Sequence, residues 1–283
     1  MPEHKLLGMA ATIAELFAGR LPVHDLYGPE GAHLYHNFTL RDTAEIDELL
    51  GLSATRGGPV LELACGSGRI TLPFLRSGYE VVGLDSSQYM LGLLADRLRE
   101  PENQPCAAQL STVEGDMTAF ALRRRFPVIV LGATAIWNVD EARRASLFSC
   151  VREHLAENGR FFLTVLTFAG LADATSPLEN MTVFVSRDRT SPVLCTLIDY
   201  VEPAGLRCTS ILCQRVDGGT VTDTAMYSAW SYLAAPVALA NEIGRQGLRV
   251  VAQHEVMGRH EISRNNTSAG RRRLLFEVAL ANQ

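Results

Sequence analysis

Short apolar runs alternate with amphipathic stretches between residues 59 and 167. The apolar runs predict strands at residues 60–63, 80–84, 127–131 and 160–167. Apolar residues recur at helical spacing over Tyr89–Arg99 and over Ala142–Ala156, and Gly159 is expected to cap the second of these helices. This order predicts an α/β fold in which a parallel sheet is covered by helices on both faces.

The pattern changes after residue 167, where a plain alternating core would continue with a helix. Alternating extended runs at 182–187, 194–201, 207–216 and 220–232 predict an antiparallel insertion. Asp217-Gly218-Gly219 is a suitable hairpin turn within it. A helix from Pro236 to Gly247 and strands at 248–255 and 273–280 are then expected to close the main sheet, and an amphipathic helix is expected over 6–17.

The composition excludes several classes of protein. Hydrophobic residues make up 47% of the 283 residues, but no apolar stretch approaches the roughly 18 residues of a membrane span. The six cysteines form no C-x-x-C pair, so neither zinc nor a disulfide framework is predicted, and no metal site is expected. Acidic residues exceed basic ones, 31 against 26, which argues against a nucleic acid partner. No signal peptide is recognised, and a cytoplasmic location is expected.

The most informative motif is Pro-Val-Leu-Glu-Leu-Ala-Cys-Gly-Ser-Gly at residues 59–68. A buried strand runs into a turn of small residues, and Gly66 and Gly68 permit positive φ and the close approach of a ligand at the strand's carboxyl end. The residues after Gly68 are Arg-Ile-Thr. They supply neither the Lys with Ser or Thr of a phosphate-binding loop nor the third glycine of a dinucleotide fingerprint. The loop therefore predicts a different nucleotide cofactor.

Two acids follow the loop along the chain. Asp85 ends the second strand, and Asp116 lies in the segment Val-Glu-Gly-Asp-Met at 113–117. The loop and the two acids, in this order, resemble a class I S-adenosylmethionine-dependent methyltransferase, with Ala64 at the position of the motif's first glycine. The resemblance implies a Rossmann-like, seven-stranded sheet of order 3-2-1-4-5-7-6 whose final strand is antiparallel.

The resemblance also implies a site for S-adenosylmethionine, with S-adenosylhomocysteine as the product. The glycine loop would contact the cofactor's amino-acid part, Asp85 the ribose hydroxyls, and Asp116 the adenine amino group. The predicted cofactor residues are Glu62, Ala64, Cys65, Gly66, Gly68, Asp85, Ser86, Met90, Asp116, Met117, Gly132 and Ala133. Taken alone, Asp85 or Ser86 is also a candidate helix cap, and Cys65 is better interpreted as a small buried residue than as a nucleophile.

The methyl acceptor has to be bound by segments beside this core. Residues 24–39 form a predicted polar and aromatic loop that resembles the N-terminal lids of amine methyltransferases. Tyrosines in such a lid would order the cofactor or the acceptor, and the alternative for them is ordinary half-buried packing. His36 would be a general base, and the alternative is a histidine that is hydrogen-bonded or exposed without a catalytic role. After the fourth strand, Trp137 is either a wall of the acceptor pocket or a core residue. The side-chain amide of the next residue, Asn138, is suited to hydrogen-bond an amine. The candidate catalytic residues are Tyr27, Tyr35, His36 and Asn138.

The expected layout has an N-terminal helical lid (1–58), a cofactor-binding core (59–167), a β insertion on the acceptor side (168–235) and C-terminal elements that complete the sheet (236–283). It resembles aminosugar and natural-product N-methyltransferases. The expected reaction is methyl transfer to an amine nitrogen of a small molecule or peptide in secondary metabolism, by direct displacement in a dry site. An O-methyltransferase and a cofactor-binding partner subunit without turnover are the alternatives. A monomer or homodimer is expected, without nucleic acid or membrane.

Overall fold

The computed structural model describes residues 5–40, 42–168, 171, 174–187, 192–256 and 271–282. The chain divides into two compact units, each assembled from two stretches of sequence. Residues 36–169 and 234–283 form the core unit, and residues 1–35 and 170–233 form the insertion unit. The division falls within helix α2 (Ala32–Thr39), so Tyr35 and His36 are consecutive residues of one helix.

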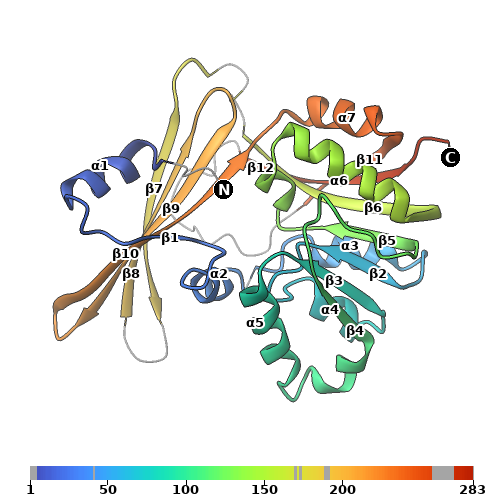
Figure 1. Cartoon of the computed structure of the whole chain (residues 1–283), viewed down its shortest axis with the longest axis horizontal. Helices are drawn as coiled ribbons and strands as arrows, with labels where there is room; N and C mark the ends of the chain where they lie inside the picture. Colours follow the sequence, from blue (N-terminus) through green and yellow to red (C-terminus); the bar gives the residue numbers. More distant parts are fainter. Residues whose placement is uncertain are drawn as a thin grey trace. The chain divides into compact units, whose positions relative to one another are not determined.

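The core unit is built on a seven-stranded sheet (Figure 1). From one edge to the other, its strands are β4 (Leu110–Glu114), β3 (Val81–Asp85), β2 (Val60–Leu63), β5 (Phe126–Leu131), β6 (Leu155–Phe168), β12 (Arg271–Leu280) and β11 (Leu248–Glu255). The first five strands are parallel, and β12 runs antiparallel to both of its neighbours. In chain order this sheet reads 3-2-1-4-5-7-6, and the predicted α/β class is confirmed.

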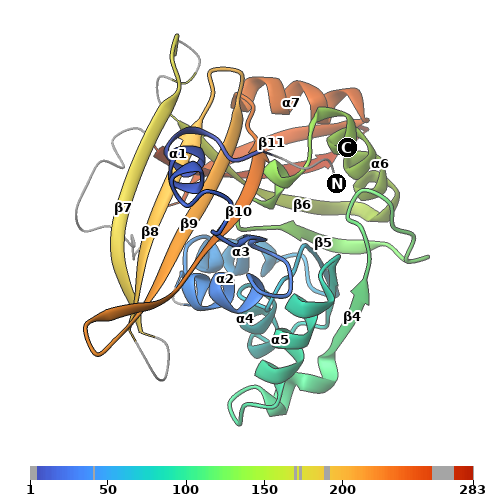
Figure 2. The ribbon, with the colours of Figure 1, turned by 60° about the vertical axis from the view of Figure 1, so that its left-hand side comes forward.

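Helices cover both faces of the core sheet because its central strands are apolar on both sides. Every residue of β2 and β3 is buried, as expected of parallel strands. Helices α6 (Glu141–His154) and α7 (Pro236–Arg245) lie on one face, and the first helices of the unit lie on the other (Figure 2). The latter are α3 (Ile46–Ser53), α4 (Thr71–Arg76) and α5 (Gln88–Leu98), followed by the short helix η1 (Gln104–Gln109). None of the helices in the described ranges is long and apolar enough to cross a membrane.

The end of helix α6 differs from the prediction. The helix stops at His154 and strand β6 begins at the next residue, so Gly159 lies within the strand and caps no helix. A Cβ on Gly159 would lie 2.9 Å from Ala156 O and 3.1 Å from Phe126 O. The register between β5 and β6 shifts at this point, after Phe126. The glycine therefore permits the close approach of two backbones at a strand irregularity.

The insertion unit holds a second sheet, of five strands (Figure 1). Its order is β1 (Val23–Asp25), β10 (Thr220–Tyr232), β9 (Leu206–Asp217), β8 (Pro192–Val201) and β7 (Leu178–Arg187). Strands β7 to β10 form an antiparallel meander, and Gly218 and Gly219 make the β9–β10 turn with positive φ. Helix α1 (Gly8–Leu16) packs against one face of this sheet through an apolar cluster that includes Ala10, Ile198 and Met226.

The prediction of a loop over residues 24–39 is wrong. Residues 23–25 form strand β1, which pairs in parallel with β10 and places Val23 opposite Met226. The chain then turns tightly at Gly31, where a Cβ would lie 2.3 Å from Asp25 O, and enters helix α2. A three-residue strand has no periodicity of its own to read from sequence, because its pairing depends on a strand about 200 residues later in the chain.

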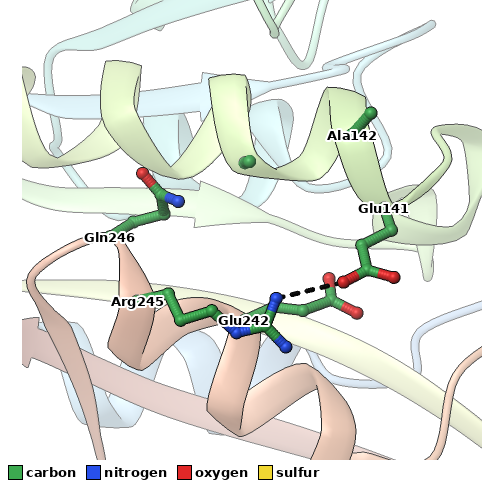
Figure 3. Close-up of a pocket in the computed structure, with 6 residues that line it drawn as sticks. Glu141, Ala142, Glu242, Arg245 and Gln246 are labelled. Carbon is green, nitrogen blue, oxygen red and sulfur yellow. Dashed lines mark hydrogen bonds and ion pairs between the residues drawn. The ribbon is translucent and has the colours of Figure 1, made fainter.

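Two ion pairs of very different burial join helices α6 and α7, and Figure 3 shows the exposed one, between Arg245 and Glu141. Arg144 Nε and Nη2 donate to the two carboxylate oxygens of Glu242 at 2.7 and 3.0 Å, and these side chains are 4% and 7% exposed. Arg245 Nη1 donates to Glu141 Oε1 at 3.1 Å, but these side chains are 63% and 65% exposed. The exposed pair and Gln246 line a surface pocket of about 400 Å³, and none of its lining residues belongs to the predicted site.

We expect these two ion pairs to differ in their contribution to stability. Glu242→Ala leaves the Arg144 guanidinium buried without its carboxylate and should lower the free energy of unfolding by about 3–5 kcal/mol. Glu141→Ala is the matched control on the same pair of helices and should cost less than about 1 kcal/mol, because water and ions screen an exposed pair. Urea unfolding of both variants measures the difference. Equal losses would contradict the expectation that the buried pair stabilises the protein more than the exposed pair does.

Candidate active site

The carboxyl end of β2 opens into the glycine loop through an uncommon backbone conformation. Ala64, Gly66 and Gly68 have φ values of 52°, 54° and 84°. A Cβ on Gly68 would lie 2.4 Å from Leu94 Cδ1, because helix α5 packs directly against the loop. A Cβ on Gly66, in contrast, would meet nothing within 4 Å. One side of the loop is therefore packed on the core, and the space beside Gly66 is open to a ligand.

Asp85, at the end of β3, is tied to the glycine loop. Its Oδ2 accepts a hydrogen bond from Gly66 N at 2.7 Å, and its Oδ1 accepts one from Ser87 N at 2.8 Å. Burial raises the pKa of Asp85, and the backbone hydrogen bonds oppose that rise. The residue that caps helix α5 is Ser87, whose hydroxyl accepts from Met90 N at 3.4 Å, whereas Ser86 is exposed. Neither Asp85 nor Ser86 is therefore the cap of helix α5, but the interpretation of Asp85 as a turn acid is confirmed by its hydrogen bond from Ser87 N.

Glu62 lies beneath the loop and is buried. Its Oε2 accepts a hydrogen bond from Thr71 Oγ1 at 2.5 Å. Burial raises the pKa of Glu62 to about 8, although the hydrogen bond from Thr71 and the charge of Arg69 act in the opposite direction. The nearby carboxylates of Asp85 and Glu45 contribute to this rise of the pKa. The Glu62 carboxyl is therefore mostly protonated at neutral pH, which limits the charge buried under the loop.

Two other predicted cofactor residues, Cys65 and Met90, are buried in the core. A Cβ on Gly83 would lie 2.9 Å from Cys65 Sγ, so the thiol packs where the neighbouring strand carries a glycine. Burial raises the pKa of Cys65 well above its usual range, which keeps the sulfur protonated. A protonated, buried thiol is a poor nucleophile. The structure thus supports the interpretation of Cys65 as a small buried residue.

Asp116 lies two residues beyond β4 and is held by two partners. Its Oδ1 accepts hydrogen bonds from Thr118 N and Thr118 Oγ1, both at 2.8 Å, and its Oδ2 accepts one from Arg143 Nη2 at 2.6 Å. Burial raises the pKa of Asp116, but the bonds from Thr118 and the charge of Arg143 outweigh it, so the pKa is lowered. Asp116 is therefore ionised, and the adjacent Met117 is half-buried beside it.

The end of β5 brings Gly132 and Ala133 to the same edge of the sheet. A Cβ on Gly132 would lie 2.1 Å from Ile70 Cδ1, so any larger residue at this position would collide with Ile70. Ile70 lies two residues beyond Gly68 of the glycine loop. Ala133 and Thr134 both have left-handed backbones, with φ values of 53° and 59°. Ala133 N donates to Glu45 Oε1 at 2.8 Å. This turn is therefore held from outside its own segment.

The short helix η2 (Ala135–Asn138) follows this turn. Trp137 is buried and its Nε1 donates to Leu166 O at 3.2 Å. Arg144 lies over its ring at 5.5 Å from the centroid. Of the two interpretations of Trp137, the core residue is therefore the one that the structure supports. Asn138 is half-buried at the end of the helix.

His36 is the candidate catalytic residue that the core unit places against the glycine loop. Its Nδ1 lies 2.8 Å from Ser67 Oγ, within hydrogen-bonding distance. Ser67 is buried, and its carbonyl oxygen accepts from Arg97 Nη1 at 2.9 Å, so the serine is fixed from both sides. In the insertion unit, the rings of Tyr27 and Tyr35 meet edge to face, with centroids 5.0 Å apart.

Comparisons with known proteins match this architecture. Residues 60–159 match the family model described as "Methyltransferase domain". The chain is 25% identical over 181 residues to the cypemycin N-terminal methyltransferase of a Streptomyces species, covering 63% of this chain and 68% of that protein.

The chain carries a class I S-adenosylmethionine-dependent methyltransferase domain.

Solved structures agree with this methyltransferase assignment. The CcbJ methyltransferase from Streptomyces caelestis superimposes with a TM-score of 0.70 over 91% of this chain and 98% of its own, and at 20% identity this likeness concerns the fold. The glycopeptide N-methyltransferase MtfA, in its complex with sinefungin, gives a TM-score of 0.62 at 27% identity, over 98% of this chain and 99% of its own. The predicted enzyme class is thereby confirmed.

The structure also gives roles to three residues that motif matching did not single out. Glu45 contacts Arg69 and Ala133 N, Ser67 contacts His36, and Arg143 contacts Asp116. Ser67 lies inside the predicted loop, between Gly66 and Gly68, and its hydroxyl is a signal that the sequence itself offers. Glu45 and Arg143 carry no such signal, because a single acid or base outside a motif is most often a surface residue.

The raised pKa of Glu62 predicts a dependence of stability on pH. Because the folded-state pKa of about 8 lies above the ordinary value of 4.5, the Glu62 contribution to stability is full below about pH 4.5 and is lost as the pH rises towards 8. Glu62→Gln retains an acceptor for Thr71 and cannot ionise. The free energy of unfolding of the wild type should therefore fall relative to that of Glu62→Gln by a few kcal/mol, at roughly 1.4 kcal/mol per pKa unit. Urea unfolding at pH 5, 6.5 and 8 measures this, and parallel profiles would contradict it.

Proposed function

We propose that this methyltransferase transfers the methyl group of S-adenosylmethionine to an amine nitrogen of a small molecule or peptide, as a tailoring step in natural-product biosynthesis. The observation that carries the proposal is the 2.8 Å contact between His36 Nδ1 and Ser67 Oγ. This contact joins a histidine, a residue type suited to proton transfer, to the loop that is proposed to bind the methyl donor. An amine nucleophile needs such a group nearby, because it attacks only in its neutral form.

The relatives support nitrogen as the acceptor atom. One relative is named as the cypemycin N-terminal methyltransferase, and MtfA is named as a glycopeptide N-methyltransferase. Both share at least a quarter of their aligned residues with this chain. Crystal structures of MtfA hold S-adenosylmethionine, sinefungin or S-adenosylhomocysteine. S-adenosylmethionine is accordingly the cofactor of this chain.

The residues at the carboxyl edge of the core sheet fit this cofactor. The space beside Gly66 is open, and Asp85 presents a carboxyl group whose two oxygens each retain acceptor capacity for a hydroxyl. The glycine loop with Glu62, Ala64 and Cys65 would hold the amino-acid part and Asp85 the ribose. Asp116 would accept from the adenine amino group, with Met117 beside the ring. Gly132 and Ala133 would leave room at the end of β5.

When bound, the cofactor would supply a methyl group on a positively charged sulfur. The amine nitrogen would take up this methyl group, and S-adenosylhomocysteine would be the leaving group. The protein's part is orientation and the handling of one proton. Holding two reactants in line and in contact can contribute about 7–11 kcal/mol to the barrier reduction. His36 is proposed to take the amine's proton, with Ser67 fixing the ring. Tyr27 and Tyr35 are proposed to order the acceptor, and Asn138 to hydrogen-bond its nitrogen.

Binding measurements test the ribose assignment. Asp85→Ala should weaken S-adenosylhomocysteine binding at least tenfold in calorimetry, because it removes charge-assisted hydrogen bonds of about 1.5–3 kcal/mol. Asp96→Ala is the control, since Asp96 lies on helix α5 and is exposed beside Arg99. Its affinity should stay within about twofold of the wild type. An Asp85→Ala affinity equal to that of the control would refute the role.

Turnover measurements test nitrogen methylation and the base. Incubation with labelled S-adenosylmethionine and paired amine and alcohol acceptors should label the amines, and labelling of alcohols alone would overturn the proposal.

His36→Ala should lower kcat at least tenfold, because general base catalysis usually contributes about 10²–10⁴-fold to the rate. Added imidazole should restore part of that rate. A His36→Ala enzyme with wild-type kcat, or one that imidazole leaves unchanged, would remove His36 from the proton transfer.

A further inference from the structure

Glu45 joins two loops at the carboxyl edge of the core sheet. It directly precedes helix α3, and its side chain is 2% exposed. Oε1 accepts hydrogen bonds from the Arg69 guanidinium and, at 2.8 Å, from Ala133 N. Arg69 directly follows the glycine loop, and Ala133 lies in the turn that ends β5. One carboxylate oxygen therefore connects the predicted cofactor loop to the turn on its other side.

Arg69 strengthens this connection through a second set of contacts. Its Nη1 donates to Asp42 O at 3.2 Å and to Ala44 O at 3.0 Å. The backbone that leads into Glu45 is thus held by the same guanidinium that binds the Glu45 carboxylate. The Arg69 guanidinium both balances the charge of the Glu45 carboxylate and fixes its position, because a planar guanidinium donates hydrogen bonds along set directions.

The backbone around the Glu45 carboxylate adopts conformations that non-glycine residues disfavour. Glu45 has a φ of 66°, and Ala133 and Thr134 are also left-handed. The carboxylate also packs closely on the turn, since a Cβ on Gly132 would lie 3.2 Å from Glu45 Oε1. Such conformations persist only where surrounding contacts impose them. At Ala133 the imposing contact is the hydrogen bond from its own N–H to Glu45.

Stability alone does not account for this arrangement. Glu45 Oε2 is buried and has no hydrogen-bond partner among the residues that the structure describes. Glu242, which forms another buried ion pair in this unit, has both oxygens bonded to Arg144. A buried carboxylate with one unpaired oxygen is a costly means of joining two segments. Its benefit lies in the geometry of the turn that it holds.

From these contacts we infer that Glu45 is a positioning residue for methyl transfer. It acts through Ala133 N–H and Arg69 to hold the end of β5 at a set distance from the glycine loop, so that cofactor and acceptor meet in line. This inference rests on the proposed function, because the glycine loop and Gly132–Ala133 are the segments proposed to bind the cofactor. It adds an acid outside the methyltransferase motifs to the residues on which the reaction depends.

Three variants test the inference. Glu45→Ala removes the acceptor of both hydrogen bonds, whereas Glu45→Gln keeps an oxygen that can accept from Ala133 N and Arg69. Glu277→Ala is the control, since Glu277 pairs with Arg160 at 2.9 Å beside the amino end of β5, where Arg160 lies opposite Val128. S-adenosylhomocysteine affinity is measured by calorimetry, kcat and KM by methyl transfer, and Tm by thermal unfolding.

Glu45→Ala should raise the Kd of S-adenosylhomocysteine at least tenfold and lower kcat at least tenfold. Glu45→Gln should stay within about threefold of the wild type in both, and Glu277→Ala should lower Tm while leaving Kd and kcat within about twofold.

If Glu45→Ala does not fold, Arg69→Met removes the other half of the connection and should raise Kd at least fivefold. Wild-type Kd and kcat in the alanine variant, or in Arg69→Met where that variant replaces it, would overturn the inference. Equal losses in the alanine and glutamine variants would also overturn it, because they would assign the effect to charge. A wild-type protein that binds no S-adenosylhomocysteine would instead refute the proposed function.

Discussion

Three buried acids set the geometry of the carboxyl edge of the core sheet. Asp85 and Glu45 accept hydrogen bonds from backbone N–H groups of other segments, and Glu62 accepts one from the hydroxyl of Thr71. A carboxyl group is costly to bury unless donors meet its oxygens, so the segments that supply the donors are held with it. The glycine loop, the end of β3 and the end of β5 are therefore positioned by one shared requirement, the solvation of buried carboxyl oxygens by the protein itself.

This requirement suits methyl transfer, in which the protein contributes mainly orientation. The methyl donor is reactive by itself, and the reaction needs two molecules held in line in a site from which water is excluded. The core unit offers a cofactor loop packed against Leu94 on one side and open beside Gly66 on the other. It also fixes His36 on Ser67 of that loop. A single hydrogen bond within one unit thus joins the proposed base to the loop that is proposed to bind the cofactor.

Local patterns predicted much of this structure, and the failures share one cause. The apolar runs of β2, β3 and β5 and the alternating runs of β8 to β10 carry their periodicity within a few residues. Gly159 does not cap a helix, because helix α6 ends at His154 and the chain then pairs with β5 in strand β6. Strand β1 was missed for the same reason, since it exists by pairing with β10.

The sequence by itself determined the α/β class, the glycine loop with its two strand-end acids, and hence the family, because these features are local and occur in a required order. It also named His36, Asp85 and Asp116 as candidates. Only the tertiary structure decided that His36 meets Ser67, that Arg143 pairs with Asp116, that Trp137 belongs to the core, and that Glu45 joins two loops. These contacts link residues about 30 to 90 positions apart in the chain. Their formation depends on the packing of whole elements, and no local pattern of residues encodes that packing.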